Sequence, residues 1–297
     1  MPDAVIISRF APSPTGRLHL GHAYSAVRAH DLARAAGGQF LLRIEDIDGT
    51  RSRDAFVAGI EEDLAWLGLN WDGPVVRQST RMPLYAEALG KLQAMGLTYP
   101  CFCTRAEIAA SASAPHGPEG PAYPGICRDL SESERAARIR EPHCWRLDMA
   151  KAIEACTPSP LAEKGFRGLW WHDEFAGWIQ ADPLAAGDVV LARKETPTSY
   201  HLAVTVDDAV QGVTDVVRGV DLFAATHIHR LLQALLGLPT PKYHHHPLLI
   251  GPDGRRLAKR NGARPLAELR GEGADPAELL ATLRAGQVPI GVPLTED

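Results

Sequence analysis

The chain has 297 residues, of which 45% are hydrophobic and 23% charged, and its formal net charge is −5. These proportions are ordinary for a soluble globular protein, and the length suffices for a buried core. No apolar run approaches the ~20 residues that a membrane-spanning helix needs. The N-terminus also lacks the basic and apolar regions of a signal peptide, so we expect a cytoplasmic protein without a membrane segment.

The first hundred residues alternate between apolar runs and helical patterns. The runs Val5–Phe10 and Phe40–Ile44 predict buried strands. Helical patterns are expected at Leu20–Ala36, 56–67 and 84–95, each followed by a glycine that ends a helix well. Strands that alternate with helices of this length indicate a parallel sheet with right-handed crossovers.

This pattern breaks after Pro100. Residues 101–188 contain clustered cysteines and many prolines and glycines. Two capping boxes, Thr104-x-x-Glu107 and Ser131-x-x-Glu134, predict short helices there. We therefore expect residues 101–188 to form an inserted α+β subdomain after a first half at 1–100.

The alternating pattern resumes in residues 189–240, with the apolar runs Val189–Arg193 and Tyr200–Val206 and a helix that we expect Asp221 to cap. Residues 241–297 form the last segment, in which Asp275 and Pro276 predict the start of a helix. The expected fold class is α/β. A doubly wound parallel sheet is interrupted by the insert and followed by a short helical tail.

A proline-rich loop and two histidines follow the first strand. His19-Leu20-Gly21-His22 opens a helix, whose N-terminus presents backbone N–H groups and the positive end of its dipole. Gly21 allows another group to approach the backbone closely. The two histidines, one turn apart, are placed to donate to phosphate oxygens, which suits a nucleotide triphosphate. The alternative is a turn with two surface histidines.

A second basic motif, Arg256-Leu257-Ala258-Lys259-Arg260, lies within the basic stretch Lys242–Arg270 and follows an apolar run and a turn. A basic loop at the carboxyl edge of a sheet can place a lysine against a phosphate. By itself, such a loop is more often solvated surface.

In this order, the two motifs resemble the two signatures of class I aminoacyl-tRNA synthetases. The second signature departs from the family pattern at Arg256 and Ala258 but retains its second lysine, Lys259. Arg9-Phe10-Ala11-Pro12-Ser13-Pro14-Thr15-Gly16 further resembles the first loop of glutamyl-tRNA synthetases. The resemblance implies a Rossmann-type catalytic domain that uses ATP with Mg²⁺. It implies catalytic roles for His19, His22 and Lys259, and ATP-binding roles for His19, Gly21, His22, Arg256 and Lys259.

Glutamate carries two carboxylates and one ammonium, so its pocket needs two cations and an acid. Arg9 is placed to fork onto the side-chain carboxylate, and Glu45 to take the ammonium. Arg218 and Tyr200 are placed to hold the α-carboxylate. The resemblance implies a glutamate site made of Arg9, Ala11, Ser13, Glu45, Tyr200 and Arg218. The alternative is that the charged residues form structural ion pairs.

Two departures point to a subfamily. The sequence ends soon after Lys259, and Val204 stands where glutamyl-tRNA synthetases usually have asparagine. Both departures resemble the truncated paralogue family, the glutamyl-queuosine tRNA(Asp) synthetases. That family forms glutamyl-adenylate without tRNA and esterifies glutamate onto queuosine in the anticodon.

The resemblance thus implies three partners for a chain that we expect to be a monomer: L-glutamate, ATP and the tRNA(Asp) anticodon stem-loop. Three alternatives stay open. They are a minimal glutamyl-tRNA synthetase that charges a 3′ end, a nucleotidylyltransferase with another acceptor, and a silent paralogue that only binds tRNA.

The cysteines favour a metal over disulfides, because their number is odd and the protein is expected in the cytoplasm. Cys101, Cys103 and Cys127 offer three thiolates, and a structural zinc usually takes four ligands. The resemblance gives Tyr123 as the fourth ligand, and His116 is the alternative. A reduced buried cluster without metal also stays open. The run His244–His246 is expected to be structural, because successive strand residues point to opposite faces.

Overall fold

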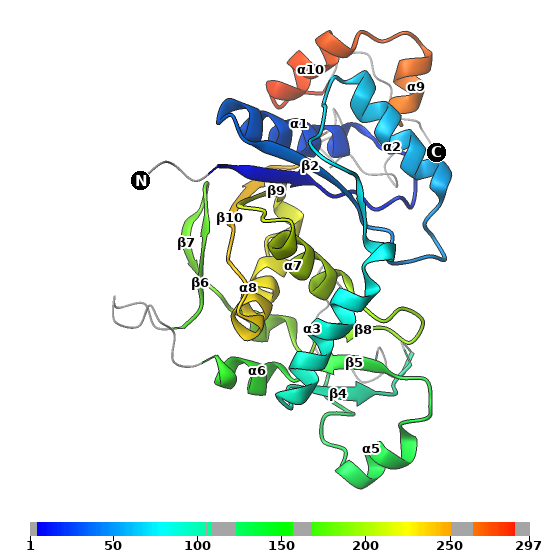
Figure 1. The fold of residues 1–297 in the computed structure, drawn as a ribbon, viewed down its shortest axis with the longest axis vertical. Helices are drawn as coiled ribbons and strands as arrows, with labels where there is room; N and C mark the ends of the chain where they lie inside the picture. Colours follow the sequence, from blue (N-terminus) through cyan, green and yellow to red (C-terminus); the bar gives the residue numbers. More distant parts are fainter. Residues whose placement is uncertain (1–4, 105, 109–122, 157–167, 251–263, 289–297) are drawn as a thin grey trace.

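The structure is a computed structural model that describes residues 5–104, 106–108, 123–156, 168–250 and 264–288. The described residues form a seven-stranded sheet with the strand order β3-β2-β1-β9-β10-β6-β7 (Figure 1). Its strands are β1 (Ile7–Phe10), β2 (Gln39–Ile44), β3 (Val76–Arg77), β6 (Trp170–Asp173), β7 (Gly177–Gln180), β9 (Asp215–Gly219) and β10 (Lys242–His246). Neighbouring strands are parallel except β6 and β7, which form an antiparallel hairpin. The predicted α/β class with a mostly parallel sheet is confirmed.

Helices cover both faces of this sheet, and strand alternation decides which residues each group contacts. Phe10, Leu42 and Val217 belong to the apolar core of the first face. It is covered by α1 (Leu20–Ala35), α2 (Asp54–Trp66), α9 (Leu266–Gly271) and α10 (Pro276–Arg284). The second face lies against α7 (Tyr200–Val210) and α8 (Ala225–Leu236), and α3 (Met82–Ala94) packs on these two helices. Figure 1 shows the two groups on either side of β1 and β2.

Strand β1 lies between the two halves of the sheet, which extend from it in opposite directions. β2 pairs with one edge of β1, and β9 pairs with the other. The junction between β1 and β9 is therefore a topological switch point, and ligands of open α/β sheets bind outside the strands' carboxyl ends at such points.

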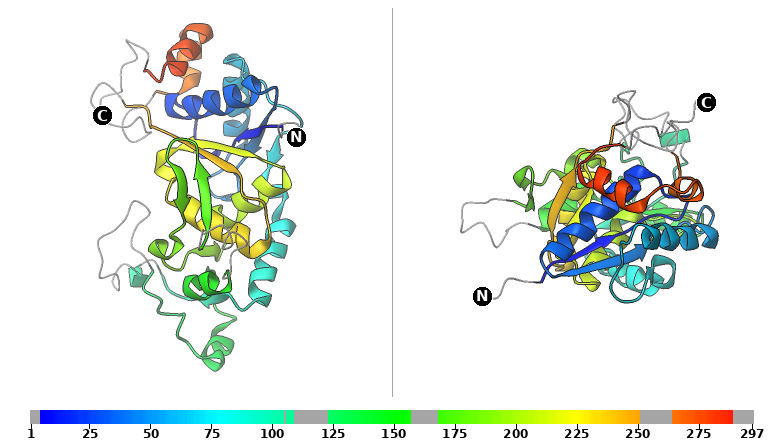
Figure 2. Two further views of the ribbon diagram at one scale, coloured as in Figure 1. Left: turned by 90° about the vertical axis from the view of Figure 1, so that its left-hand side faces the viewer. Right: turned by 90° about the horizontal axis from the view of Figure 1, so that it is seen from above.

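A smaller antiparallel sheet lies at the far end of the molecule from α9 and α10 (Figure 2). It contains β4 (Thr98–Cys101), β5 (Cys144–Leu147) and β8 (Val190–Ala192), and the helices α5 (Glu132–Arg138) and α6 (Met149–Ala155) belong to the same region. Both predicted capping boxes are present. Glu107 accepts from the Thr104 backbone N–H, and Glu134 accepts from that of Ser131.

Strand pairing does not follow the expected limits of the insert. The β6–β7 hairpin falls within 101–188, yet it joins the large sheet beside β10. β8 falls within 189–240, yet it pairs with β5. The reason for the first difference is packing, because Trp171 is fully buried in an apolar cluster with Tyr243 of β10. The four-part division of the chain stays a prediction.

Most predicted helices agree with the structure. Asp275 caps α10 by accepting from the Ala277 backbone N–H at 2.9 Å. One start was wrong: α8 begins at Ala225, and Asp221 lies before it in a single 3₁₀ turn. No helix among the described residues combines the length and apolar character needed to cross a membrane.

Candidate active site

The first signature forms the N-terminus of α1. His19 precedes the helix, and its Nδ1 accepts from the Gly21 backbone N–H at 3.1 Å. The Nδ1 of His22 accepts from the His19 backbone N–H at 3.3 Å, and the two rings stack with centroids 3.8 Å apart. A neutral ring that accepts at Nδ1 carries its proton on Nε2, which is then a donor. This geometry suits binding of phosphate oxygens at the helix start.

Arg256 and Lys259 lie outside the described residues, but both flanks of their segment are described. On the far side, Pro265 bridges to His19, and the Leu266 N–H donates to the Leu18 carbonyl at 2.8 Å. On the near side, His246 at the end of β10 contacts Ser25 of α1 at 2.9 Å. Described residues on both flanks of this segment therefore contact the first signature helix or the residues just before it.

Arg9 and Asp208 form a buried ion pair beneath the sheet. The Nε and Nη2 of Arg9 donate to the two carboxylate oxygens of Asp208 at 3.0 and 3.3 Å. A third N–H of Arg9 faces the Val217 carbonyl at 3.5 Å. Burial alone would raise the pKa of Asp208, but Arg9 and Arg43 hold it below its usual value. A guanidinium has five N–H donors, so Arg9 retains hydrogen-bonding capacity for a second carboxylate.

Arg43 connects this pair to Glu45. Its side chain is fully buried, and it donates to Asp208 at 2.7 Å and to Glu45 at 3.3 Å. Burial raises the pKa of Glu45, and Arg43 and Arg9 only partly offset this effect. Ser13 donates to the Glu45 carbonyl at 2.9 Å, so the proline-rich loop is joined to the end of β2. Ala11 is half-buried directly after β1.

Arg218 is surrounded by neutral acceptors. It donates to His245 at 3.1 Å, to Tyr200 at 3.3 Å and to Thr226 at 2.6 Å, and it contacts His229 at 3.4 Å. Its exposed fraction is 5%. No ion pair joins Arg218 to a carboxylate within the described ranges. A buried guanidinium without a counter-charge is costly, which indicates that an anionic ligand belongs beside it.

These groups converge on Tyr200 at the start of α7. Burial raises the pKa of Tyr200. The positive charges of Arg218 and Arg9 lower the pKa of Tyr200, whereas the negative charge of Glu45 raises it further. All three charged groups therefore lie near the Tyr200 hydroxyl. The structure thus brings together the predicted residues Arg9, Glu45, Tyr200 and Arg218. Val204, the predicted subfamily marker, is buried on the same helix.

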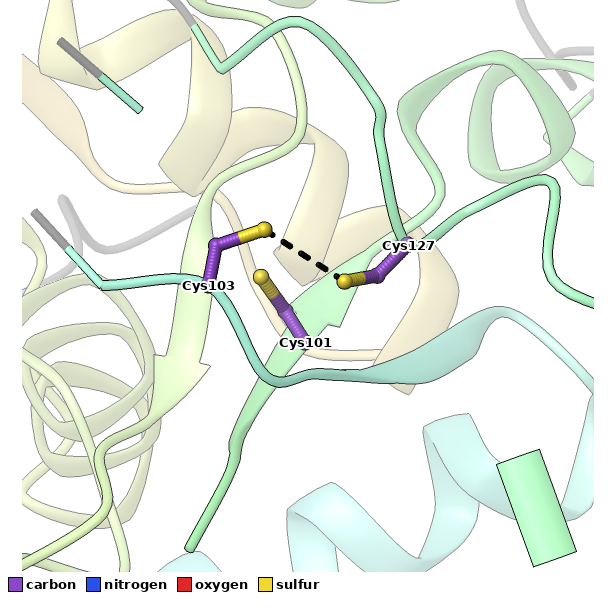
Figure 3. A group of neighbouring side chains, drawn as sticks. All are labelled: Cys101, Cys103 and Cys127. Atoms are coloured by element: carbon purple, nitrogen blue, oxygen red, sulfur yellow. Dashed lines mark hydrogen bonds between the residues drawn. The ribbon is translucent and has the colours of Figure 1, made fainter. Parts of the chain in front are cut away.

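The three predicted metal-binding cysteines also come together (Figure 3). Their sulfur atoms lie within 4.8 Å of one another, and Cys103 and Cys127 are 3.5 Å apart. Two thiolates at about 2.3 Å from a tetrahedral ion would be about 3.8 Å apart, so the cluster fits a zinc-sized ion. The Tyr123 hydroxyl lies 3.6 Å from the Cys103 sulfur, on the same cluster. His116, the alternative ligand, lies outside the described residues.

Comparison with known proteins adds independent information. The family model for the catalytic domain of class I tRNA synthetases (E and Q) matches residues 5–290. A Glutamyl-Q tRNA(Asp) synthetase of Rhodobacter capsulatus is 52% identical over 92% of this chain and 98% of its own length. Its namesake from Symbiobacterium thermophilum is 46% identical over 94% of this chain and 85% of its own length.

The chain belongs to the class I tRNA synthetases of the glutamyl and glutaminyl group. The predicted resemblance to Glutamyl-Q tRNA(Asp) synthetases is confirmed, and the chain is a ligase of this family. The crystal structure of a glutamate tRNA ligase from Elizabethkingia meningosepticum, in complex with its amino acid, is similar with a TM-score of 0.76 and 27% identity. That similarity covers 94% of this chain but only 60% of the ligase.

Two residues that contact the predicted site arginines were not predicted from the sequence of this synthetase: Asp208, which pairs with Arg9, and His245, which accepts from Arg218. Asp208 was missed because its partner Arg9 is 199 positions away in the sequence. His245 was read as structural, although it contacts Arg218. One signal was present in the sequence: Arg9, Arg43 and Arg218 stand inside or directly beside apolar runs, and a charge in a buried strand requires partners.

Replacing Cys101 by serine should lower metal content and stability together. Serine removes one soft thiolate from the cluster, and the region around it relies on few apolar contacts. Zinc per chain, measured by mass spectrometry, should fall well below that of the parent, and the thermal midpoint should fall by several degrees. Cys156→Ser is the matched control, because Cys156 lies outside the cluster. A metal-free parent protein that is stable and indifferent to chelator would contradict this prediction.

Proposed function

We propose that this synthetase activates L-glutamate with ATP to glutamyl-adenylate, without tRNA, and then transfers glutamate to queuosine at the wobble position of tRNA(Asp). The observation that carries the first half is the unneutralised guanidinium of Arg218, buried on the same face of the sheet as Arg9 and Glu45. The second half rests on the name of relatives at 40–52% identity.

The charges of the site match glutamate. Four arginines and three carboxylates form this network, which leaves one formal positive charge: Arg9, Arg43, Arg81 and Arg218 against Glu45, Asp207 and Asp208. Glutamate carries one net negative charge and would neutralise the site. The α-carboxylate would bind Arg218 and Tyr200, the ammonium would bind Glu45, and the side-chain carboxylate would bind the remaining donors of Arg9. Glutamine carries no net charge and would leave the site cationic.

The chemistry is in-line attack of the glutamate α-carboxylate on the α-phosphate of ATP–Mg²⁺, with loss of pyrophosphate. His19 and His22 would donate to phosphate oxygens at the start of α1, where backbone N–H groups also point. We propose that Lys259 binds the same phosphates, since the described residues on either side of its segment, His246 and Pro265, contact Ser25 and His19. Catalysis is then positional and electrostatic, and no protein nucleophile is required.

A metal at the cysteine cluster would be structural. Cys101, Cys103, Cys127 and Tyr123 supply four donors and would leave no position for substrate. We propose a zinc ion, since thiolate-rich tetrahedral sites favour zinc.

Queuosine is a chemically suitable acceptor. Its cyclopentene diol presents two neighbouring hydroxyls, as does the ribose of a 3′-terminal adenosine. The chain covers nearly the whole of the Rhodobacter capsulatus relative, whose name specifies the tRNA(Asp) acceptor. The chief alternative is a minimal glutamyl-tRNA synthetase that charges a 3′ end.

The acceptor can be identified by charging total tRNA with labelled glutamate. We expect label on tRNA(Asp) only when queuosine is present, and we expect it to survive removal of the CCA end, because the ester forms in the anticodon loop. Matched tRNA pools from cells with and without queuosine provide the control. Charging of queuosine-free tRNA(Glu) that disappears when CCA is trimmed would establish the alternative instead.

Glutamine should be a poor substrate. Its neutral amide would leave one buried guanidinium charge uncompensated, which costs about 3–5 kcal/mol in a fully buried setting. We therefore expect kcat/KM in pyrophosphate exchange to be at least ~10²-fold lower for glutamine than for glutamate. Similar values for the two amino acids would refute the proposed charge balance.

Lys259→Ala should remove most adenylate formation and leave the fold intact. Loss of one preorganised donor to a developing charge typically costs a factor of ~10²–10³ in rate. Glutamate-dependent pyrophosphate exchange measures the rate, and urea unfolding measures the fold. Lys151→Ala is the control, because Lys151 is 62% exposed on α6. Exchange by Lys259→Ala within a few-fold of the parent would exclude the assigned role.

A further inference from the structure

The unusual feature of Arg218 is how its neighbours hold it. Strand β10 pairs with β9 in parallel, and His245 stands directly opposite Arg218 in the register. Their side chains therefore leave the sheet on the same face. The Nε of Arg218 donates to the Nε2 of His245 at 3.1 Å, and both residues are buried, with exposed fractions of 5% and 4%.

A carboxylate fixes the tautomer of His245. Its Nδ1 lies 2.7 Å from the Oδ2 of Asp173, which also accepts from the His245 backbone N–H at 3.1 Å. A ring that donates from Nδ1 to a carboxylate presents Nε2 as an acceptor. Burial and the Arg218 charge lower the pKa of His245 to about 4, so the ring is neutral at physiological pH.

The order Asp173, His245, Arg218 keeps the negative charge one ring away from the guanidinium. A carboxylate in direct contact would neutralise Arg218, as Asp208 does for Arg9. A neutral ring instead fixes the orientation of Arg218 and leaves its charge for a ligand.

We propose that His245, oriented by Asp173, is a positioning residue that directs the charge of Arg218 toward the α-carboxylate of the substrate. This inference rests on the proposed function, because it takes glutamate as the substrate of this site. Asp173 itself is a poor position to mutate, because its other oxygen accepts from the Phe175 and Ala176 backbone N–H groups in the β6–β7 turn. The test therefore uses His245.

Two amide substitutions separate the acceptor from the rest of the side chain. In His245→Gln, the two amide heteroatoms are spaced much like the two ring nitrogens, so the side chain can donate to Asp173 and accept from Arg218. In His245→Asn, the shorter amide can reach Asp173 but not Arg218. His244→Asn is the matched control, because His244 pairs with Asp215 at 2.7 Å on the opposite face of the same strand.

The measurement is binding of two ligands by calorimetry, glutamate and its analogue with the α-carboxylate reduced to an alcohol. In His245→Asn, glutamate should bind ~10-fold more weakly, since hydrogen bonds to charged groups are individually strong, while the alcohol and ATP bind as in the parent. His245→Gln and His244→Asn should keep the parent preference for glutamate over the alcohol.

Equal weakening of both ligands in a folded His245→Asn, or no weakening of either, would overturn the inference. So would a tenfold loss of glutamate affinity in a folded His245→Gln, which keeps the test decisive if His245→Asn does not fold. Failure of the proposed function would look different: the parent protein itself would show neither glutamate binding nor glutamate-dependent pyrophosphate exchange.

Discussion

Three arginines buried on one face of the sheet constrain the rest of this structure. Arg9, Arg43 and Arg218 each have exposed fractions of 5% or less. Moving such charges out of water is costly unless partners surround them. Asp208 of helix α7 pairs with both Arg9 and Arg43. Asp207 on the same helix forms an ion pair with Arg81, which lies just before α3. The position of α7 is thus fixed by charge as well as by its apolar contacts.

The three arginines differ in how far their charges are balanced by neighbouring carboxylates, and this difference indicates a different role for each. Arg43 is fully buried, donates to Asp208, Gln211 and Glu45, and lies 4.0 Å from Asp207, so it holds these acids together and has a structural role. Arg9 shares one carboxylate and keeps further donors. Arg218 has only neutral acceptors among the described residues. Arg43 therefore needs no ligand to balance its charge, whereas Arg218 lacks a negatively charged partner among the described residues. Arg218 lies on β9, next to the switch point between β1 and β9.

Sequence patterns predicted the parts of the fold that depend on local order. The helix after His19, the strands around Arg9 and Arg43, and the cysteine cluster all agree with the structure. The β6–β7 hairpin was not predicted, because the pairing of β6 with β10 and the packing of Trp171 against Tyr243 join segments about seventy positions apart and leave no local periodicity. Asp208 escaped for the same reason. Its role depends on a partner in another strand, and no spacing in the sequence encodes that contact.

The three consecutive histidines of β10 have different contacts because successive side chains of a strand point to opposite faces of the sheet. His244 pairs with Asp215, and His246 contacts Ser25 of α1, both on the face that carries the first signature. His245 points to the other face and holds Arg218. Adjacent residues of one strand therefore reach the face that carries the first signature and the face that carries Arg218. A shift of β10 by one residue would exchange these contacts, so its register relative to β9 determines both the contact with α1 and the contact with Arg218.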